Sequence, residues 1–221
     1  MPFHYELRFV GAGGQGNMLA GTIIAEAAIF YENKYAPQVP TYTSQVRGGP
    51  TKADVIIDDQ PIEFAESTHI DFLLALDQRA FELYKGDLKV NALVLIDSHL
   101  VQVSPEDQQR RDVYAYPIVR TAKYEIGKLV TANILAVGLT VELTAVLDKE
   151  NVRKAIRARV PAAFLDLNMR AYDLGLQAAR ELRSRKRQLM AADRLACPSM
   201  VPPSDVLTAL APSTCGQPMT A

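Results

Sequence analysis

The residues with the clearest chemical potential are four closely spaced glycines, Gly11, Gly13, Gly14 and Gly16, with Gln15 among them. An apolar run at positions 7–10 precedes them and a helix-like segment follows, in the pattern G-x-G-x-x-G. Glycines let the backbone turn tightly at such a junction, and free N–H groups at the start of the helix favour an anion. The pattern predicts a loop that binds a phosphate or a nucleotide. The alternative is a turn with no ligand, which only packs a strand against a helix.

The segment after the predicted helix argues against a standard NAD or FAD site. A dinucleotide-binding unit places Asp or Glu at the end of a second strand, about 20 residues beyond the glycines. Here Glu32 comes too early, and Pro37 and Pro40 interrupt any apolar strand over residues 31–40. We therefore expect the glycine loop to serve a different ligand.

Three motifs together resemble the gamma subunit of the 2-oxoacid:ferredoxin oxidoreductases. They are G-x-G-G-Q-G at the first turn, Arg47-Gly48-Gly49 ahead of the run A-D-V-I-I, and D-F-L-L-A-L at residues 71–76. The similarity extends from about residue 6 to about residue 159, and the apolar segment 128–147 around Asn133 is similar to a late helix of that family. Members of the family act on pyruvate, 2-oxoglutarate, indolepyruvate, phenylglyoxylate or branched-chain acids, and the sequence does not choose among them.

The resemblance implies a subunit of a hetero-oligomeric enzyme that converts a 2-oxoacid and coenzyme A (CoA) into an acyl-CoA and carbon dioxide. Thiamine diphosphate, Mg²⁺ and [4Fe-4S] clusters are then expected in partner subunits, and none in this chain alone. The implied partners are alpha, beta and ferredoxin-like subunits, with ferredoxin or a flavin- or NAD-linked subunit as electron acceptor. The chain alone is expected to be inactive, to contact CoA and to help hold the complex together.

We expect the CoA-docking surface at the two glycine motifs. Arg47 is the strongest candidate for a phosphate or carboxylate contact because its guanidinium forms bidentate hydrogen bonds, but it is equally suited to an acid across a subunit interface. The residues of this expected surface are Gly11, Gly13, Gly14, Gln15, Gly16, Arg47, Gly48 and Gly49.

Each of these residues also has a purely structural explanation. Gln15 either donates to a ligand or satisfies the carbonyl groups of its own loop, and Gly48 with Gly49 forms a tight turn even with no ligand. Lys52 is a weaker candidate cation. Asn133 is better explained as a buried, hydrogen-bonded asparagine that fixes helix packing.

Composition excludes several other classes of protein. The 221 residues are 48% hydrophobic, which is enough for one good core, and a net charge of −1 with no basic stripe gives no support to nucleic-acid binding. The N-terminus has no signal-peptide pattern, so we expect a cytoplasmic protein. The most apolar segment, 130–147, contains Thr131, Asn133 and Glu142 and is therefore expected to be a buried helix rather than a membrane span.

Metal, hydrolase and nucleotide-hydrolysing sites also lack their usual residues. The only cysteines, Cys197 and Cys215, are too few for a four-cysteine cluster, and the three histidines are far apart in sequence. No Gly-x-Ser-x-Gly motif occurs, and Asn17 and Met18 stand where a phosphate-binding P-loop would have Lys and Ser or Thr.

The elements that must position these residues form an α/β pattern. Apolar runs at 5–10, 53–57, 72–76, 92–96 and 113–116 alternate with helical segments, which predicts a Rossmann-like, open, mostly parallel sheet flanked by helices. Asp77 and Asp97 follow two of these runs. They could share a crevice with the glycine loop at the carboxyl edge of the sheet, but capping of the next segment is the favoured role.

The helices and the C-terminal part follow from capping residues and composition. Ser104 with Pro105 begins a short helix, Asp148 caps one that ends at Arg159, and Pro161 opens another. Residues 1–184 are expected to form the gamma-subunit domain. Residues 185–221, which begin within the basic cluster 183–187 and are rich in proline beyond it, are expected to be an extended arm, either disordered or wrapped over a partner subunit.

Two other classes of function remain open at this stage. One is a free-standing nucleotide-binding oxidoreductase or regulator that uses the glycine loop. The other is a purely structural assembly protein whose loop holds no ligand.

Overall fold

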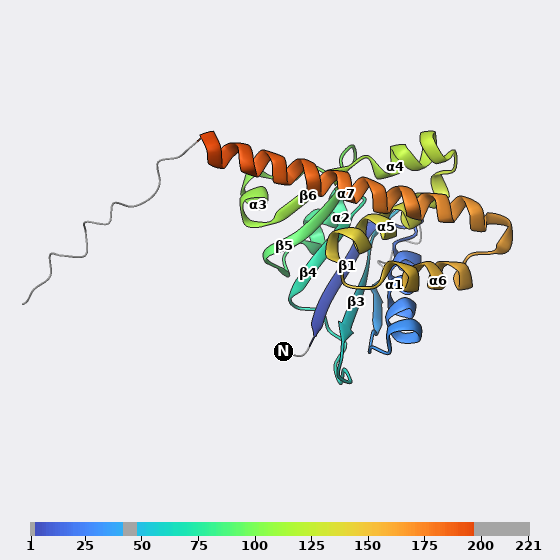
Figure 1. Cartoon of the computed structure of the whole chain (residues 1–221). Coiled ribbons are helices and arrows are strands. Elements are labelled where there is room, and N and C mark those ends of the chain that lie inside the picture. The colour runs from blue at the N-terminus through green and yellow to red at the C-terminus, as the bar shows by residue number, and fades with distance from the viewer. Residues whose placement is uncertain (1–2, 42–47, 197–221) are drawn as a thin grey trace, which may run out of the picture. The chain divides into compact units, whose positions relative to one another are not determined.

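The computed structural model describes residues 3–41 and 48–196, with the backbone alone for residues 190–196. Within these residues the chain forms a six-stranded sheet with helices on both faces (Figure 1). The predicted α/β fold with a mostly parallel, helix-flanked sheet is confirmed. The strand order is β2-β3-β1-β4-β5-β6. The strands are β1 (His4–Ala12), β2 (Gln38–Thr41), β3 (Pro50–Asp58), β4 (Ile70–Ala75), β5 (Leu88–Asp97) and β6 (Asp112–Tyr116).

The sheet changes direction at β1. Strands β1, β4, β5 and β6 run parallel to one another, whereas β3 is antiparallel to both β1 and β2. Because β3 runs the opposite way, its beginning at Pro50 lies opposite Ala12, the last residue of β1. The turn that precedes β3 therefore lies at the same edge of the sheet as the glycine loop.

Strand β2 was not expected from the sequence. It contains Pro40 and overlaps the segment 31–40, where prolines were expected to interrupt any apolar strand, so a strand forms at residues 38–41 in spite of the proline. The physical reason is position, because β2 is an edge strand and the missing N–H of a proline is tolerated there. The strand carries no acid and is antiparallel to its neighbour, unlike the second strand of a dinucleotide-binding unit.

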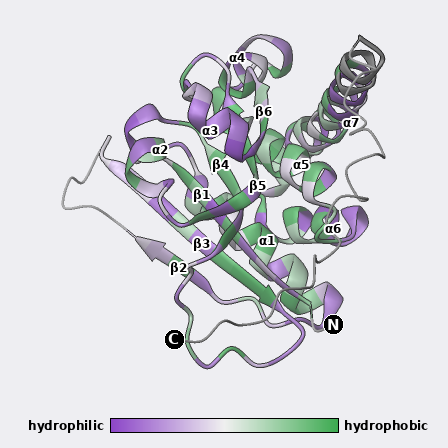
Figure 2. Ribbon diagram, turned by 90° about the vertical axis from the view of Figure 1, so that its left-hand side faces the viewer, coloured by the Kyte–Doolittle hydropathy of each residue, from purple (hydrophilic) through white to green (hydrophobic). Residues whose placement is uncertain are grey.

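One face of the sheet shares a hydrophobic core with four helices. Alternate residues of β1 explain the two faces, since Leu7 and Phe9 enter this core while Arg8 and Val10 point to the other side. Figure 2 shows hydrophobic residues concentrated in the central strands and in helices α1 (Asn17–Glu32) and α5 (Ala132–Thr144). The helices of this face are α1 (Asn17–Glu32), α5 (Ala132–Thr144), α6 (Lys149–Arg159) and α7 (Leu165–Ala196).

The other face packs mainly against α2 (Gln78–Tyr84), whose Phe81 is fully buried against the strands. Helix α3 (Pro105–Arg110) lies beside β6. The expected caps are confirmed, because Ser104 accepts a hydrogen bond from the N–H of Asp107 at 3.1 Å, and Asp148 accepts one from the N–H of Glu150 at 2.9 Å. These contacts fix where α3 and α6 begin.

Between β6 and α5 the chain makes three short helical turns, α4 (Ile118–Thr121), the π-helical η1 (Ala122–Ile126) and the 3₁₀-helical η2 (Leu129–Thr131). Helix α5, which follows, is buried over nearly its whole length, as the sequence predicts. The polar residues that set this segment apart from a membrane span are buried inside the protein. Thr140, for example, donates from its hydroxyl to the carbonyl oxygen of Ala136 at 2.8 Å.

Helices α5 and α7 cross at two glycines. A Cβ atom on Gly138 would collide with the carbonyl oxygen of Tyr172 and lie 3.1 Å from the Cα of Gly175. A Cβ on Gly175 would in turn lie 3.0 Å from the Cα of Gly138. The two backbones therefore touch directly at this point, which only glycine allows.

Helix α7 continues into the segment that was expected to be an extended arm. A 3₁₀ turn, η3 (Ala162–Phe164), precedes it, and the helix then continues to Ala196, so residues 185–196 are helical rather than extended. The basic residues in this stretch are good helix formers, which is why they do not end the helix. A first compact unit nevertheless ends at Arg183. The remainder of the expected arm, with Cys197 and Cys215, lies outside the described residues.

Candidate functional site

The glycine loop has the backbone that its composition predicts. Gly14 has a φ of +100° and Gly16 a φ of +81°, both in the left-handed region that favours glycine. Gly16 is the residue immediately before α1, and its lack of a side chain leaves the beginning of that helix without a side-chain cap. The N–H groups of the first turn of α1 are therefore not used by a capping side chain.

Gln15 holds this loop in place. Its Oε1 accepts from the N–H of Ala12 at 2.7 Å, and its Nε2 donates to the carbonyl oxygen of Leu76 at 3.0 Å. Both ends of the amide are thus engaged, which ties the loop to the end of the neighbouring strand. Of the two roles considered for Gln15, the structure displays the one in which it satisfies the groups of its own loop.

The second glycine motif lies beside the first. The N–H of Gly13 donates to the carbonyl oxygen of Gly49 at 2.9 Å, and a guanidinium nitrogen of Arg79 donates to the carbonyl oxygen of Gly48 at 3.0 Å. Gly48 has a φ of +74°, as expected for a glycine turn leading into β3. Arg47, the expected phosphate contact, lies outside the described residues.

A cavity of about 540 Å³ opens beside the glycine loop. Gly14, Gln15 and Gly16 form one wall, and Asn133 forms part of another. The remaining walls are aliphatic, and no charged residue of the described part of the chain lines the cavity. These aliphatic residues are Leu19, Leu76, Val119, Leu129, Val130 and Ala132.

Two asparagines lie where helices begin near the loop. Asn133 is 5% exposed, and its Oδ1 accepts from the N–H of Ile134 at 2.9 Å, as expected for a buried structural asparagine. Its Nδ2 faces Gly16, because a Cβ there would lie 2.6 Å from that nitrogen. Asn17 is 3% exposed and lies against Gly11, and neither its Oδ1 nor its Nδ2 has a hydrogen-bond partner.

The two aspartates at strand ends are caps. Asp77 accepts from the N–H of Ala80 at 3.0 Å at the start of α2. Asp97 is fully buried and accepts from the N–H of His99 at 2.9 Å and of Val119 at 2.8 Å. The favoured capping role is therefore confirmed for both, and neither lines the cavity. Asp97 instead accepts a hydrogen bond from the N–H of Val119 and so holds in place a residue that lines the cavity.

Lys52 is not a free cation. Its Nζ contacts Asp54 at 3.0 Å, beside a buried ion pair in which Arg8 donates to both carboxylate oxygens of Asp54 at 2.8 and 2.9 Å. Sequence reasoning missed this cluster. Arg8 and Asp54 are direct partners across β1 and β3. Each is a charged residue within a mainly apolar run, and two such residues of opposite charge were the signal that could have predicted the cluster.

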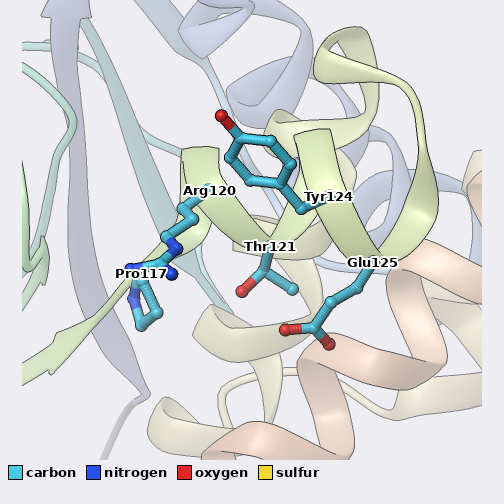
Figure 3. Close-up of a pocket in the computed structure, with 5 residues that line it drawn as sticks. All are labelled: Pro117, Arg120, Thr121, Tyr124 and Glu125. Atoms are coloured by element: carbon cyan, nitrogen blue, oxygen red, sulfur yellow. The ribbon is translucent and has the colours of Figure 1, made fainter.

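A second pocket, of about 600 Å³, is formed by Pro117 with side chains of α4 and η1. Figure 3 shows Arg120 and Glu125 on opposite sides of Thr121, with the exposed Tyr124 above them. One positive and one negative side chain line this pocket, so it has no preference for either charge.

Metal-binding clusters of three or more His, Cys, Asp or Glu are not found among the described residues. His4 instead contacts the carboxylates of Asp58 at 2.7 Å and Glu6 at 3.2 Å. Within the part of the chain that the structure describes, no helix has the length and apolar character needed to span a bilayer.

Comparison with known protein families shows which family this chain belongs to. Residues 6–178 match the family model described as pyruvate ferredoxin/flavodoxin oxidoreductase. The chain belongs to this oxidoreductase family. The resemblance proposed from the glycine motifs is thereby confirmed.

The relatives of this oxidoreductase chain are subunits of 2-oxoacid oxidoreductases. The 2-oxoglutarate synthase subunit KorC of Methanocaldococcus jannaschii is 38% identical over 177 residues, covering 80% of this chain and 95% of that protein. The common gamma subunit of the pyruvate and ketoisovalerate oxidoreductases of Thermococcus litoralis is 29% identical, covering 69% of this chain and 84% of that protein.

A solved structure agrees with these sequence comparisons. The gamma subunit of a keto/oxoacid ferredoxin oxidoreductase from Geobacter sulfurreducens superposes with a TM-score of 0.74 at 44% identity, covering 81% of this chain and 98% of that one. This oxidoreductase chain is accordingly an enzyme-complex subunit of the gamma type. Further subunits are therefore expected with it.

Proposed function

We propose that this gamma-type subunit docks CoA for a 2-oxoacid oxidoreductase whose reacting centre lies in other subunits. In the reaction, a 2-oxoacid and CoA give an acyl-CoA, carbon dioxide, a proton and two electrons. The carbon–carbon bond to the carboxylate breaks, the new bond joins the acyl carbon to the CoA sulfur, and the electrons pass to an acceptor such as ferredoxin. Thiamine diphosphate, Mg²⁺ and iron–sulfur clusters in the alpha, beta and ferredoxin-like subunits would supply that chemistry.

The observation that carries this proposal is the cavity beside the glycine loop. A largely aliphatic cavity with a few hydrogen-bond donors at one end is the usual form of a small-molecule site. Its volume, about 540 Å³, is large enough for part of a CoA molecule. The N–H of Gly13 donates to the carbonyl oxygen of Gly49, so the second glycine motif lies beside this loop, but of the two motifs only Gly14, Gln15 and Gly16 line the cavity.

The choice of 2-oxoacid is proposed to lie outside this chain. A relative carries the name of a common subunit of pyruvate and ketoisovalerate oxidoreductases, and two enzymes with different substrates that share a subunit must select them elsewhere. The free-standing oxidoreductase or regulator has no support from the relatives. A purely structural role differs from CoA docking in one measurable property, the effect of CoA on stability.

Thermal unfolding of the full chain with CoA and with NAD tests the proposal. A ligand that binds only the folded state raises the unfolding midpoint, so CoA is expected to raise it and NAD to leave it unchanged. A midpoint indifferent to saturating CoA would remove CoA docking and favour the structural role. A shift caused by NAD alone would favour the nucleotide-binding alternative.

A further inference from the structure

Three large apolar side chains are exposed in the segment that joins β6 to α5. Tyr124 is 69% exposed, Leu129 is 55% exposed and Val130 is 75% exposed. They belong to η1 and η2, which contact each other. The helical turns beside α4 project from the first compact unit in Figures 1 and 2. Neighbouring apolar side chains that face solvent in this way are typical of an interaction site.

The same segment carries a positive charge. Arg120, Lys123 and Lys128 are exposed together with a single acid, Glu125, so three cations and one anion give residues 120–130 a net charge of +2. Within the described part of the chain, none of these three cations has an ion-pair partner. We call the exposed side chains of residues 120–130 the 120–130 surface. An apolar centre with cations around it fits a protein face that is apolar at its centre and acidic at its rim.

The 120–130 surface is continuous with the opening of the cavity beside the glycine loop. Leu129 and Val130 belong to both, because they line the cavity and are also exposed. A protein that covers this surface therefore also lies at the opening of the cavity. In the proposed function the sulfur of CoA has to reach an acyl carbon held by another subunit, and this opening is where that subunit has to lie.

Two other occupants fit the surface less well. A second copy of this chain in a symmetric contact would place a net charge of +2 opposite the same charge, which is repulsive. The C-terminal residues 197–221, which lie outside the described residues, contain a single acidic side chain, Asp205. One acid cannot match three cations.

A relative with a longer chain supports a partner from the same enzyme. The ketoisovalerate oxidoreductase subunit VorA of Methanothermobacter marburgensis is 26% identical over 80% of this chain but only 37% of that protein. In VorA a domain of this type therefore shares its chain with further sequence of an oxidoreductase subunit. Where the domain is a separate chain, a surface contact has to replace that covalent link.

We propose that the 120–130 surface docks the partner subunit that holds the reacting centre, through a face of that subunit that is apolar at its centre and acidic at its rim. The three exposed apolar side chains fill the centre of the contact, and the three cations pair with acids around it. The choice of that subunit rests on the proposed docking of CoA by this chain, whereas the surface itself follows from exposure and charge.

Purification of the tagged full chain from its source cell, with thiamine diphosphate measured per tagged chain, tests the surface. The untagged chain of the same cell competes for the partner, so the thiamine recovered reports relative affinity. Val130→Asp puts an acid at the centre of a contact with an acidic face. The thiamine recovered is expected to fall by roughly tenfold or more.

Val90→Asp is the matched control, because Val90 is 67% exposed near the start of β5, at the opposite edge of the sheet from the glycine loop. It is expected to recover as much thiamine as the unaltered chain. Unfolding midpoints equal to that of the unaltered chain would show that both variants fold. If Val130→Asp recovers thiamine like the unaltered chain, or if both variants lose it equally, the proposed surface is overturned.

Reversal of one charge tests the rim without altering the cavity, because Lys123 does not line it. Lys123→Glu is expected to lower the thiamine recovered by roughly threefold or more, and to make recovery less sensitive to added salt. Lys154→Glu, at an exposed position of α6, is the control and is expected to have no effect. Equal recovery by the two variants would contradict an acidic partner face.

The remaining outcomes separate this proposal from the proposed function. The full chain alone is expected to sediment as a monomer, and a dimer that Val130→Asp abolishes would assign the surface to a second copy. An unaltered chain that recovers no thiamine would overturn the docking of the partner. An unaltered chain that recovers thiamine but whose unfolding midpoint does not respond to CoA would lose the proposed function and keep the docking surface.

Discussion

At the scale of single residues, Arg8 is the side chain whose substitution is expected to lower the free energy of unfolding most. It is 1% exposed, and it donates to Asp54 and to the carboxylate of Asp87 at 2.7 Å. Burial lowers the pKa of Arg8, but the hydrogen bonds to the two carboxylates raise it by more, so the guanidinium stays charged. A buried charge of this kind stabilises a fold only while its partners remain.

Arg8→Met is expected to lower the free energy of unfolding by about 3 to 5 kcal/mol, because it leaves Asp54 buried beside Lys52 alone. The double variant with Asp54→Leu removes the unpaired carboxylate and is expected to lose less than the single variant. Urea denaturation of both variants and the unaltered chain measures this. A double variant as unstable as the sum of the two single variants would contradict the coupling.

His4 gives the protein a pH-dependent contribution to stability. Burial lowers the pKa of His4, but hydrogen bonds to Asp58 and Glu6 raise it by more, so it lies above the ordinary 6.5. The hydrogen bond from His4 is the largest reason that the pKa of Asp58 lies below its ordinary 3.8. The His4 contribution is therefore fully present below 6.5 and is lost as pH rises through the raised pKa.

We expect the loss of stability in His4→Gln to be larger near about pH 6 than near about pH 8.5, because only the protonated ring has the extra attraction. The free energy of unfolding at the two pH values, compared with the unaltered chain, measures the difference. His99→Gln, which removes a ring that is hydrogen-bonded to the hydroxyl of Ser98 and not to a carboxylate, is the control. A loss of stability in His4→Gln that increases with pH would contradict this prediction.

At the scale of elements, the crossing of α5 and α7 depends on two missing side chains. In an exposed helix Gly→Ala is favourable by about 1 kcal/mol, because glycine is a poor helix former. At Gly138 the added methyl group would collide with the backbone of α7. The two effects oppose each other, and the collision is expected to dominate because backbone atoms cannot move aside as a side chain can.

Gly138→Ala is therefore expected to lower the free energy of unfolding by about 1 to 3 kcal/mol, the usual cost of overpacking. Gly86→Ala makes the same change where a Cβ would meet no atom within 4 Å, and it is expected to be neutral or slightly stabilising. Guanidinium denaturation of both variants measures the contrast. Equal stabilities of the two variants would show that the helices can separate to admit a methyl group.

At the scale of the whole molecule, the first compact unit ends at Arg183, close to the proposed domain boundary at 184. Arg183 itself belongs with this unit, since it donates to the carbonyl oxygen of Leu143 at 2.9 Å. A chain shortened to residues 1–184 is therefore expected to keep the free energy of unfolding of the full chain within about 0.5 kcal/mol. Chemical denaturation of both chains measures it.

The same shortened chain tests the proposed arm. If residues 185–221 wrap a partner subunit, the shortened chain is expected to fold normally but to recover less of the alpha and beta subunits in a pull-down from its source cell. Full recovery of the partners would show that assembly depends on residues 1–184 alone. Iron and thiamine analysis of the recovered complex would check the proposed cofactors of the partners.

The sheet was largely predictable because its central strands are continuous apolar runs. The run that ends at Asp97 indicates burial on both faces, and the strand is found there. Strand β2 was missed because edge strands tolerate proline and need little apolar sequence. The length of α7 was missed because arginine and lysine suit a helix interior as well as a helix end, so composition alone did not mark where the helix stops.

The candidate site was predictable in part for a different reason. The glycine motifs mark backbone turns, and these depend on local sequence. The cavity joins residues 14–19 to residues 119–133, and a contact over that distance in sequence leaves no pattern in either segment.

The direct contact of Gly138 with Gly175 also has a consequence for entropy. Most helix pairs hold together by side chains that give up rotamer freedom when they pack, at a cost of up to about 2 kcal/mol for a long side chain. Where α5 and α7 touch, neither residue has a rotamer to lose. The entropy cost comes instead from the backbone, because glycine has the most conformational freedom in the unfolded chain. The crossing is therefore favourable only once both helices are already formed.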